Sequence, residues 1–277
     1  MLVVRMSNIS LFILFGIVLL LIFVSLYIFV FNKKSPSSSH EIPRIIWSFW
    51  DSEEIPPIIK KCTDTWYEKN QNYEIRIINM NNIHKYLHNY EIYSIKNWKY
   101  NDSPQRLSDL VRLHVLSKYG GVWLDASIVC YENFDWVHEE KSDCLLYSIP
   151  ELSTVPLLES WFIACTPNNS YVNAWKNEFM SVEKFDSVHE YVDDCNIDMT
   201  GINFPDYLLV YVCARKVYLE DPSRIKILNA TTGPYNYHAQ GGVSQLCRVQ
   251  KPKFFKFRKE DRAALNDELM KCVFPTT

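Results

Sequence analysis

Hydrophobic and polar positions divide the chain into one long apolar run followed by short alternating segments. Residues 9–31, ISLFILFGIVLLLIFVSLYIFVF, hold no charged side chain over 23 positions. Roughly 20 apolar residues in a helix span a membrane, whereas the apolar core of a cleaved signal peptide has about 7 to 15. The pattern predicts a transmembrane signal anchor at 9–31 behind a short tail at 1–8. A signal peptide and a buried helix are the alternatives.

The composition changes directly after the apolar run. Residues 32–42, NKKSPSSSHEI, are polar and rich in serine, which predicts a flexible stem. No internal repeat and no second linker interrupts the remaining sequence. We therefore expect a single domain over residues 43–277.

Short apolar runs alternate with helix-period segments through this domain. The helix expected at 103–118 has the clearest ends, because Ser103 suits an N-cap and Pro104 a first turn, while Gly120 and Gly121 stop it. The alternation predicts an α/β fold with helices on the faces of a sheet. The expected strands are 44–49, 73–78, 121–128, 144–149 and 161–165, and the other expected helices are 56–69, 82–88, 170–180 and 206–218.

Two acids and an arginine stand near one expected strand end. Asp109 and Arg112 are three residues apart on one helix and therefore share a face. The next strand carries Asp125 near its carboxyl end, where ligands bind in open α/β sheets. Taken separately, the first two residues fit a surface ion pair of little energetic value, and Asp125 fits a solvated acid. Their combination favours a ligand site.

The stretch SPQRLSDLVRLHVLSKYGGVWLDAS, residues 103–127, resembles the sugar-nucleotide-binding segment of glycosyltransferase family 32 and, more closely, the capsular polysaccharide synthesis proteins. The likeness extends upstream to residue 43 and, more weakly, downstream to about residue 218. It implies a single glycosyltransferase-A domain, a Rossmann-like nucleotide-binding fold. The implied activity is transfer of a hexosyl group from a UDP- or GDP-sugar donor to a glycan or glycolipid acceptor, with the anomeric configuration retained.

The same resemblance implies roles for individual residues. Asp125 would bind the metal or the ribose and sugar, while Asp109 and Arg112 would hold donor-sugar hydroxyls and phosphate. Asp125, Ser127 and His238 would be the ligands of Mn²⁺ or Mg²⁺, which stabilises a departing diphosphate as a Lewis acid. Ser127 stands where the DxD pattern of family 32 has its second acid. The site is then either a weaker metal site, completed by diphosphate and water, or an inactive one.

Three of the implied site residues have open alternatives. Trp47 is expected to lie against the nucleotide base, and an ordinary core tryptophan is its alternative. Asp206 is expected near the acceptor as a catalytic residue. His238 follows the sequence Thr232-Gly233-Pro234 and could reach the metal or diphosphate, with a surface-loop histidine as its alternative.

Cysteines and glycosylation sequons bear on the compartment. The domain carries eight cysteines, and Asn101, Asn168 and Asn229 begin N-x-S/T sequons, which favours disulfide bonds and an oxidising lumen. Basic residues flank the apolar run on both sides, so they do not decide its orientation. We expect a single-pass type II membrane glycoprotein with its catalytic domain in the lumen of the Golgi or endoplasmic reticulum. A capsule-type enzyme facing the cytosol and a catalytically inactive nucleotide-sugar-binding or glycan-binding protein are the alternatives.

Charge and cysteine spacing exclude two classes of function. The net charge of −3 argues against a nucleic-acid-binding protein, and the absence of CxxC spacing argues against a structural zinc site. Residues 251–262, KPKFFKFRKEDR, form a basic run with interleaved aromatic residues. Such a run is most often a solvated face, and contact with phosphate or a membrane surface is the alternative.

Overall fold

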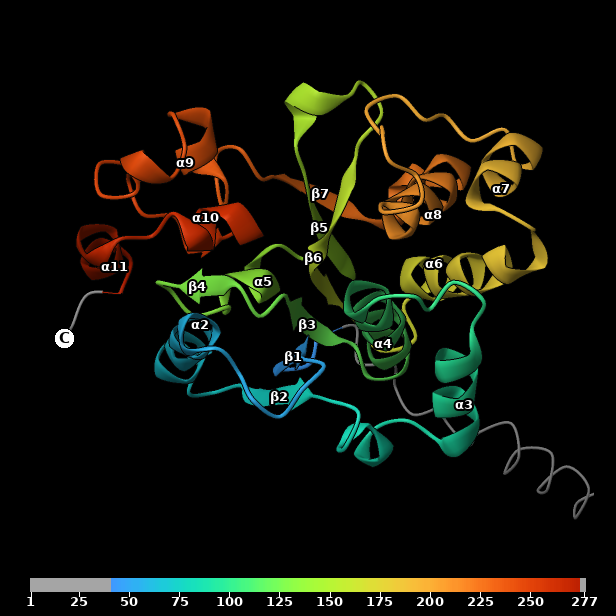
Figure 1. Ribbon diagram of the computed structural model, residues 1–277, viewed down its shortest axis with the longest axis horizontal. Helices are drawn as coiled ribbons and strands as arrows, with labels where there is room; N and C mark the ends of the chain where they lie inside the picture. The colour runs from blue at the N-terminus through green and yellow to red at the C-terminus, as the bar shows by residue number, and fades with distance from the viewer. Residues whose placement is uncertain (1–40, 275–277) are drawn as a thin grey trace, which may run out of the picture. The chain divides into compact units, whose positions relative to one another are not determined.

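A six-stranded mixed sheet runs through the middle of the molecule (Figure 1). The structure, a computed structural model, describes residues 41–274. Strand β6 is antiparallel to both of its neighbours, β3 and β5, whereas the pairs β1–β2, β1–β3 and β5–β7 are parallel. The sheet order is β2 (Glu74–Ile78), β1 (Ile45–Phe49), β3 (Gly121–Leu124), β6 (Leu158–Cys165), β5 (Cys144–Ser148) and β7 (Lys226–Asn229).

A second sheet has two strands, β4 (Ile128–Cys130) and β8 (Phe254–Lys256), which pair antiparallel. The sequence predicted one continuous strand over residues 121–128, and this prediction is wrong. Strand β3 ends at Leu124. The chain then turns, and the amide of Ile128 donates to the carbonyl oxygen of Asp125 at 3.0 Å. Residues 125–127 therefore form a turn between two sheets.

Helices cover both faces of the large sheet, and the predicted α/β class is confirmed (Figure 1). The predicted helix at 82–88 is only a short 3₁₀ turn, Ile83–Lys85, and the helix that follows it was not predicted. The helices are α2 (Pro57–Lys69), α3 (Asn89–Asn97), α4 (Pro104–Tyr119), α5 (Trp136–Glu139), α6 (Ser170–Ser181), α7 (Val188–Asp194), α8 (Leu209–Glu220), α9 (Asn236–Ala239), α10 (Lys259–Ala263) and α11 (Asp267–Val273).

Each face of the sheet carries its own hydrophobic cluster, because neighbouring residues of a strand point to opposite faces. On one face, Trp47 and Trp123 pack in a cluster with residues of α4, α6 and α8. On the other face, Ile46 and Leu124 pack with residues of α2, β4 and β8. The turn at Asp125 follows directly after β3, which contributes side chains to both clusters.

Helix α4 begins and ends where the sequence predicted. The Ser103 hydroxyl accepts a hydrogen bond from the amide of Arg106 at 3.3 Å, which makes Ser103 the N-cap. Gly120 has a φ of +61°, and a Cβ atom on it would lie 2.5 Å from the backbone nitrogen of Pro167. Only glycine fits this close approach. The connection between α4 and β3 is thereby fixed, and so is the position of Arg112 relative to Asp125.

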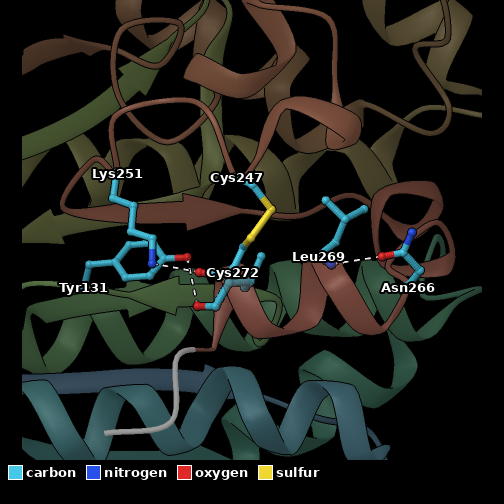
Figure 2. Close-up of a disulfide and its surroundings, with 7 residues drawn as sticks. Tyr131, Cys247, Lys251, Asn266, Leu269 and Cys272 are labelled. Carbon is cyan, nitrogen blue, oxygen red and sulfur yellow. Dashed lines mark hydrogen bonds between the residues drawn. A yellow bond between two sulfur atoms is a disulfide. The ribbon is translucent and has the colours of Figure 1, made fainter.

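A disulfide joins Cys247 to Cys272, at the end of α11 (Figure 2). The ammonium of Lys251 donates to the carbonyl oxygen of Cys272 at 2.7 Å, and the hydroxyl of Tyr131 donates to that of Val273 at 3.1 Å. These bonds tie α11 to the chain that flanks β4 and β8. The predicted occurrence of a disulfide is confirmed for this pair, while the six other cysteines, all within residues 41–274, are unpaired there.

The predicted tail, membrane anchor and most of the stem, residues 1–40, lie outside the described residues. Within residues 41–274, no helix is both long and apolar enough to cross a membrane. The described residues all fall in one compact unit, His40–Thr277. The predicted domain bounds stay a prediction.

Candidate active site

Asp125 lies where β3 stops, beside the first half of β6. Its backbone amide donates to the carbonyl oxygen of Trp161 at 3.0 Å, which fixes the turn against β6. About 30% of its side chain is exposed, so a ligand can reach the carboxylate. Charged side chains reach it from α4 and from β8. We therefore build the site outward from Asp125.

Helix α4 supplies a buried arginine that joins two acids. One terminal nitrogen of Arg112 lies 2.9 Å from Asp109 Oδ1, and the other donates to Asp125 Oδ1 at 3.0 Å. The guanidinium also lies over the ring of Trp123, 4.9 Å from its centre, and the Trp123 indole nitrogen donates to Asp125 Oδ1 at 3.1 Å. The structure brings the three predicted residues together, and the interpretation of a wet surface ion pair is wrong.

The pKa values of the two carboxyl groups shift in opposite directions although they share Arg112. Burial raises the pKa of Asp109 to about 6, and the nearby arginine only partly opposes this. Burial would also raise the pKa of Asp125, but the charges of Arg112 and Lys256 and the Trp123 hydrogen bond bring it below its ordinary value. Asp125 is therefore ionised throughout the neutral range, whereas Asp109 gains its charge only as the pH rises through about 6.

Lys256 of β8 lies on the other side of Asp125. The ammonium of Lys256 donates to the Ser127 hydroxyl at 2.9 Å and to the Phe257 carbonyl oxygen at 3.1 Å, and it lies 3.5 Å from Asp125 Oδ2. The Ser127 hydroxyl in turn donates to the Phe257 carbonyl oxygen at 2.8 Å. Burial lowers the pKa of the Lys256 ammonium, while Asp125 opposes that change. A cation thus already stands between Asp125 and Ser127.

The predicted metal ligands do not form one donor set. A Mg²⁺ or Mn²⁺ ion held by Asp125 and Ser127 would lie against the Lys256 ammonium, and two cations repel each other in a buried site. His238 Nε2 lies instead 3.2 Å from Asp261 Oδ2. Within residues 41–274, no group of three or more His, Cys, Asp or Glu side chains is placed to hold a metal. The metal stays a prediction from resemblance, and the described side chains do not fit it.

A buried glutamate lies at the same edge of the sheet. Glu159, near the start of β6, accepts a hydrogen bond from the hydroxyl of Tyr211 at 2.9 Å. Burial raises the pKa of Glu159 to about 7, although Tyr211 and the charges of Lys256 and Arg258 oppose this. A carboxyl group with such a pKa can take up or release a proton near neutral pH. Arg258 is exposed, with its guanidinium 5.1 Å from the centre of the Tyr235 ring.

The family of the chain follows from a match to the capsular polysaccharide synthesis protein family over residues 25–210. This segment includes α4, β3, Asp109, Arg112 and Asp125. The chain belongs to that family. The predicted resemblance to capsular polysaccharide synthesis proteins is thereby confirmed, whereas Lys256 and Arg258 lie beyond the matched segment.

Solved structures that resemble the chain include three glycosyltransferases, at low sequence identity. PaToxG glycosyltransferase is 14% identical with a TM-score of 0.44, over 84% of this chain and 83% of that chain. The ligand-free glycosyltransferase domain of the YGT toxin is 10% identical with a TM-score of 0.48, over 69% and 80%. A glycosyltransferase involved in glycosylation of the major capsid of PBCV-1 is 10% identical with a TM-score of 0.42, over 81% and 97%. No curated protein matches the sequence.

In this member of the capsular polysaccharide synthesis family, Trp47 belongs to the core. Its side chain is fully buried, and its indole nitrogen donates to the Gly120 carbonyl oxygen at 2.8 Å. The Arg76 guanidinium covers one face of the ring, 4.7 Å from its centre. The structure supports the core alternative, because no face of this ring is open to a nucleotide base.

Asp206 and His238 lie outside the cluster around Asp125. Asp206 precedes α8 and is about 71% exposed, with its carboxylate 3.5 Å from His189 Nε2. Its carbonyl oxygen accepts from Arg106 of α4. His238 pairs with Asp261, and burial lowers the pKa of its imidazole. A role for Asp206 near the acceptor stays a prediction.

Sequence reasoning missed Lys256, Arg258 and Glu159. The solvated-face interpretation of residues 251–262 is wrong for its centre, since residues 254–257 are all buried. The signal was present in KFFKFRK, where Lys256 is flanked by phenylalanines that alternate like a strand. Glu159 had a weaker signal, a lone acid in the apolar run LESWFIAC.

We predict that Glu159 makes stability fall as the pH rises. In the folded state Glu159 stays protonated between its ordinary pKa and about 7, whereas in the unfolded chain it ionises at its ordinary pKa. The contribution of Glu159 to the free energy of unfolding is therefore present at low pH and is lost as the pH rises through about 7. Between pH 4 and pH 8, the free energy of unfolding should fall in wild type by roughly 2–3 kcal/mol more than in Glu159→Gln. Urea unfolding at both pH values measures this.

The control is Glu183→Gln, which changes an exposed glutamate and should keep the pH dependence of wild type. Equal pH dependence in wild type and Glu159→Gln would contradict the prediction.

Proposed function

We propose that this protein is a glycosyltransferase that moves a sugar from a nucleotide diphosphate donor to a hydroxyl group of a glycan or glycolipid. The observation that carries the proposal is the ionised Asp125, held by Arg112 at the end of β3 inside the family-matched segment. Ligands of open α/β sheets bind at this edge. We assign the domain to the glycosyltransferase-A type on the same grounds.

The proposed reaction breaks the bond between the anomeric carbon of the sugar and the diphosphate oxygen. The electron pair of that bond leaves with the diphosphate, and the anomeric carbon forms a new bond to the acceptor oxygen. The acceptor proton passes to the departing diphosphate, which suits a retaining transfer on one face of the sugar. A hexosyl donor and retention of configuration are parts of the proposal that follow from the resemblance.

Burial assigns different tasks to the three residues of the cluster. The Asp125 carboxylate is partly exposed and can accept hydrogen bonds from sugar or ribose hydroxyls, whereas only about 4% of the Arg112 side chain is exposed. Arg112 and Asp109 therefore orient Asp125 from behind. This modifies the expectation that both of them contact the donor directly.

The test uses the full-length chain purified in detergent, with a panel of UDP- and GDP-sugars. One donor should raise the melting temperature by mass action, and the same donor should be hydrolysed slowly or transferred to added glycans. Release of UDP or GDP measures the turnover. If no sugar nucleotide is bound or turned over, with or without Mn²⁺, the proposal is wrong.

The departure at Ser127 keeps a second function open, that of an anchored binding protein without catalysis. Ser127 brings no charge where the DxD pattern has an acid, and its hydroxyl is bonded to Phe257. A protein of this kind would bind UDP or GDP but release no nucleotide from any donor. The same panel separates the two functions.

We further propose that residues 9–31 anchor the protein as a type II membrane protein with the catalytic domain in the Golgi or endoplasmic reticulum lumen. The disulfide Cys247–Cys272 and the exposed sequon residue Asn168 support an oxidising compartment. Endoglycosidase treatment of the protein from cells should lower its apparent mass. An unchanged mass together with eight free thiols would favour the cytosol-facing alternative.

A further inference from the structure

We propose that Lys256 binds the donor diphosphate directly, in the place beside Asp125 that a divalent cation would take, so that nucleotide binding needs no metal. This inference rests on the proposed function. It concerns a residue outside the family-matched segment, from the basic run that sequence analysis assigned to a solvated face.

The position of the ammonium carries the inference. Lys256 Nζ donates to Ser127 Oγ and to the Phe257 carbonyl oxygen, and these two bonds hold it at the end of β3. Its distance to Asp125 Oδ2 is 3.5 Å, longer than a charge-assisted hydrogen bond of about 2.7–2.9 Å. An ammonium has three N–H donors, and the third makes only this longer contact with Asp125. It can be given to a phosphate oxygen.

The Ser127 hydroxyl explains why a lysine suits this turn. Ser127 Oγ donates to the Phe257 carbonyl oxygen and accepts from Lys256. An aspartate at this position would carry no proton to donate to that carbonyl oxygen. Ser127 therefore suits a site in which Lys256 is the neighbouring cation. The second acid of the DxD pattern would suit a site in which a metal ion is the cation.

The charge of Lys256 suits the leaving group. When the bond from the anomeric carbon to the diphosphate breaks, its electron pair stays on the diphosphate oxygen, so negative charge grows there. A preorganised ammonium stabilises that charge without being consumed.

The test is calorimetry of UDP and of GDP with the full-length chain, in EDTA and in Mn²⁺. For the nucleotide that binds wild type, Kd should differ by less than about 3-fold between the two buffers. Lys256→Met should weaken binding in EDTA by about 10-fold or more, and Lys256→Arg should retain most of it. Lys253→Met is the matched control, because this exposed lysine of the same basic run pairs with Glu132, and its Kd should equal that of wild type.

Each failure has a distinct result. Nucleotide binding by wild type that requires Mn²⁺ would overturn the inference and leave the proposed function intact. Binding in EDTA that is unchanged in a folded Lys256→Met would also overturn it. If neither nucleotide binds in either buffer, the proposed function fails and the inference falls with it. If Lys256→Met does not fold, the wild-type comparison and Lys256→Arg still decide.

Discussion

Replacing Asp125 with asparagine is expected to lower turnover of the sugar nucleotide by about 10²–10³-fold, the usual effect of removing one preorganised electrostatic contact. The substitution keeps the size of the side chain and one oxygen that can accept from Trp123. It removes the charge that Arg112 and Lys256 both face. The donor then loses a charged hydrogen-bond acceptor, and two neighbouring cations lose their counter-charge.

Nucleotide release at saturating donor measures this effect, and urea unfolding shows whether the variant is folded. Asp64→Asn is the matched control, because it removes an exposed acid from the pair between Lys60 and Asp64 on α2. That variant should keep wild-type turnover. Wild-type turnover in a folded Asp125→Asn would show that Asp125 is not part of the active site.

Replacing Arg112 with methionine should cost about 3–5 kcal/mol of unfolding free energy, because breaking a buried ion pair leaves uncompensated charge. Two carboxyl groups, Asp109 and Asp125, would face each other without the guanidinium between them. The loss should be largest above pH 7 and smaller at pH 5, where protonation relieves their repulsion. Urea unfolding at both pH values gives the numbers.

Two further variants test the cause of that loss. Lys60→Met removes a cation from an exposed i,i+4 pair and should cost less than about 1 kcal/mol. The double variant Asp109→Asn/Arg112→Met should recover part of the loss, because one of the uncompensated acids is gone. A loss below about 1 kcal/mol in Arg112→Met would contradict the buried-pair interpretation.

Elements with local signals were predicted well from the sequence. Helix α4 has an N-cap serine and a C-terminal glycine pair, and both act as expected. The strand at 121–128 was extended too far because Ile128 and Val129 continue an apolar run. What stops β3 is a turn at Asp125 and a partner strand at residues 254–256. Apolar patterning indicates a strand near residues 254–256, but it does not tell which strand this segment pairs with.

The site was predicted in the same uneven way. Asp109, Arg112 and Asp125 lie within 17 consecutive residues, so their helix and strand bring them together through one short connection. Lys256 reaches the site only because β8 pairs with β4, and no local pattern predicts a pairing across more than 120 residues. The sequence did not decide the role of Trp47, because an indole in a strand fits a hydrophobic core and a ligand pocket equally well.

The pairing of β4 with β8 has a consequence for the order in which the protein becomes active. During synthesis, all six strands of the large sheet emerge before residue 254 does. Contacts between distant parts of a chain also form slowly because long loops must close first. A nascent chain therefore contains Asp109, Arg112 and Asp125 before it contains Lys256. The site is complete only when β8, the last strand to be synthesised, pairs with β4 and brings Lys256 to Asp125.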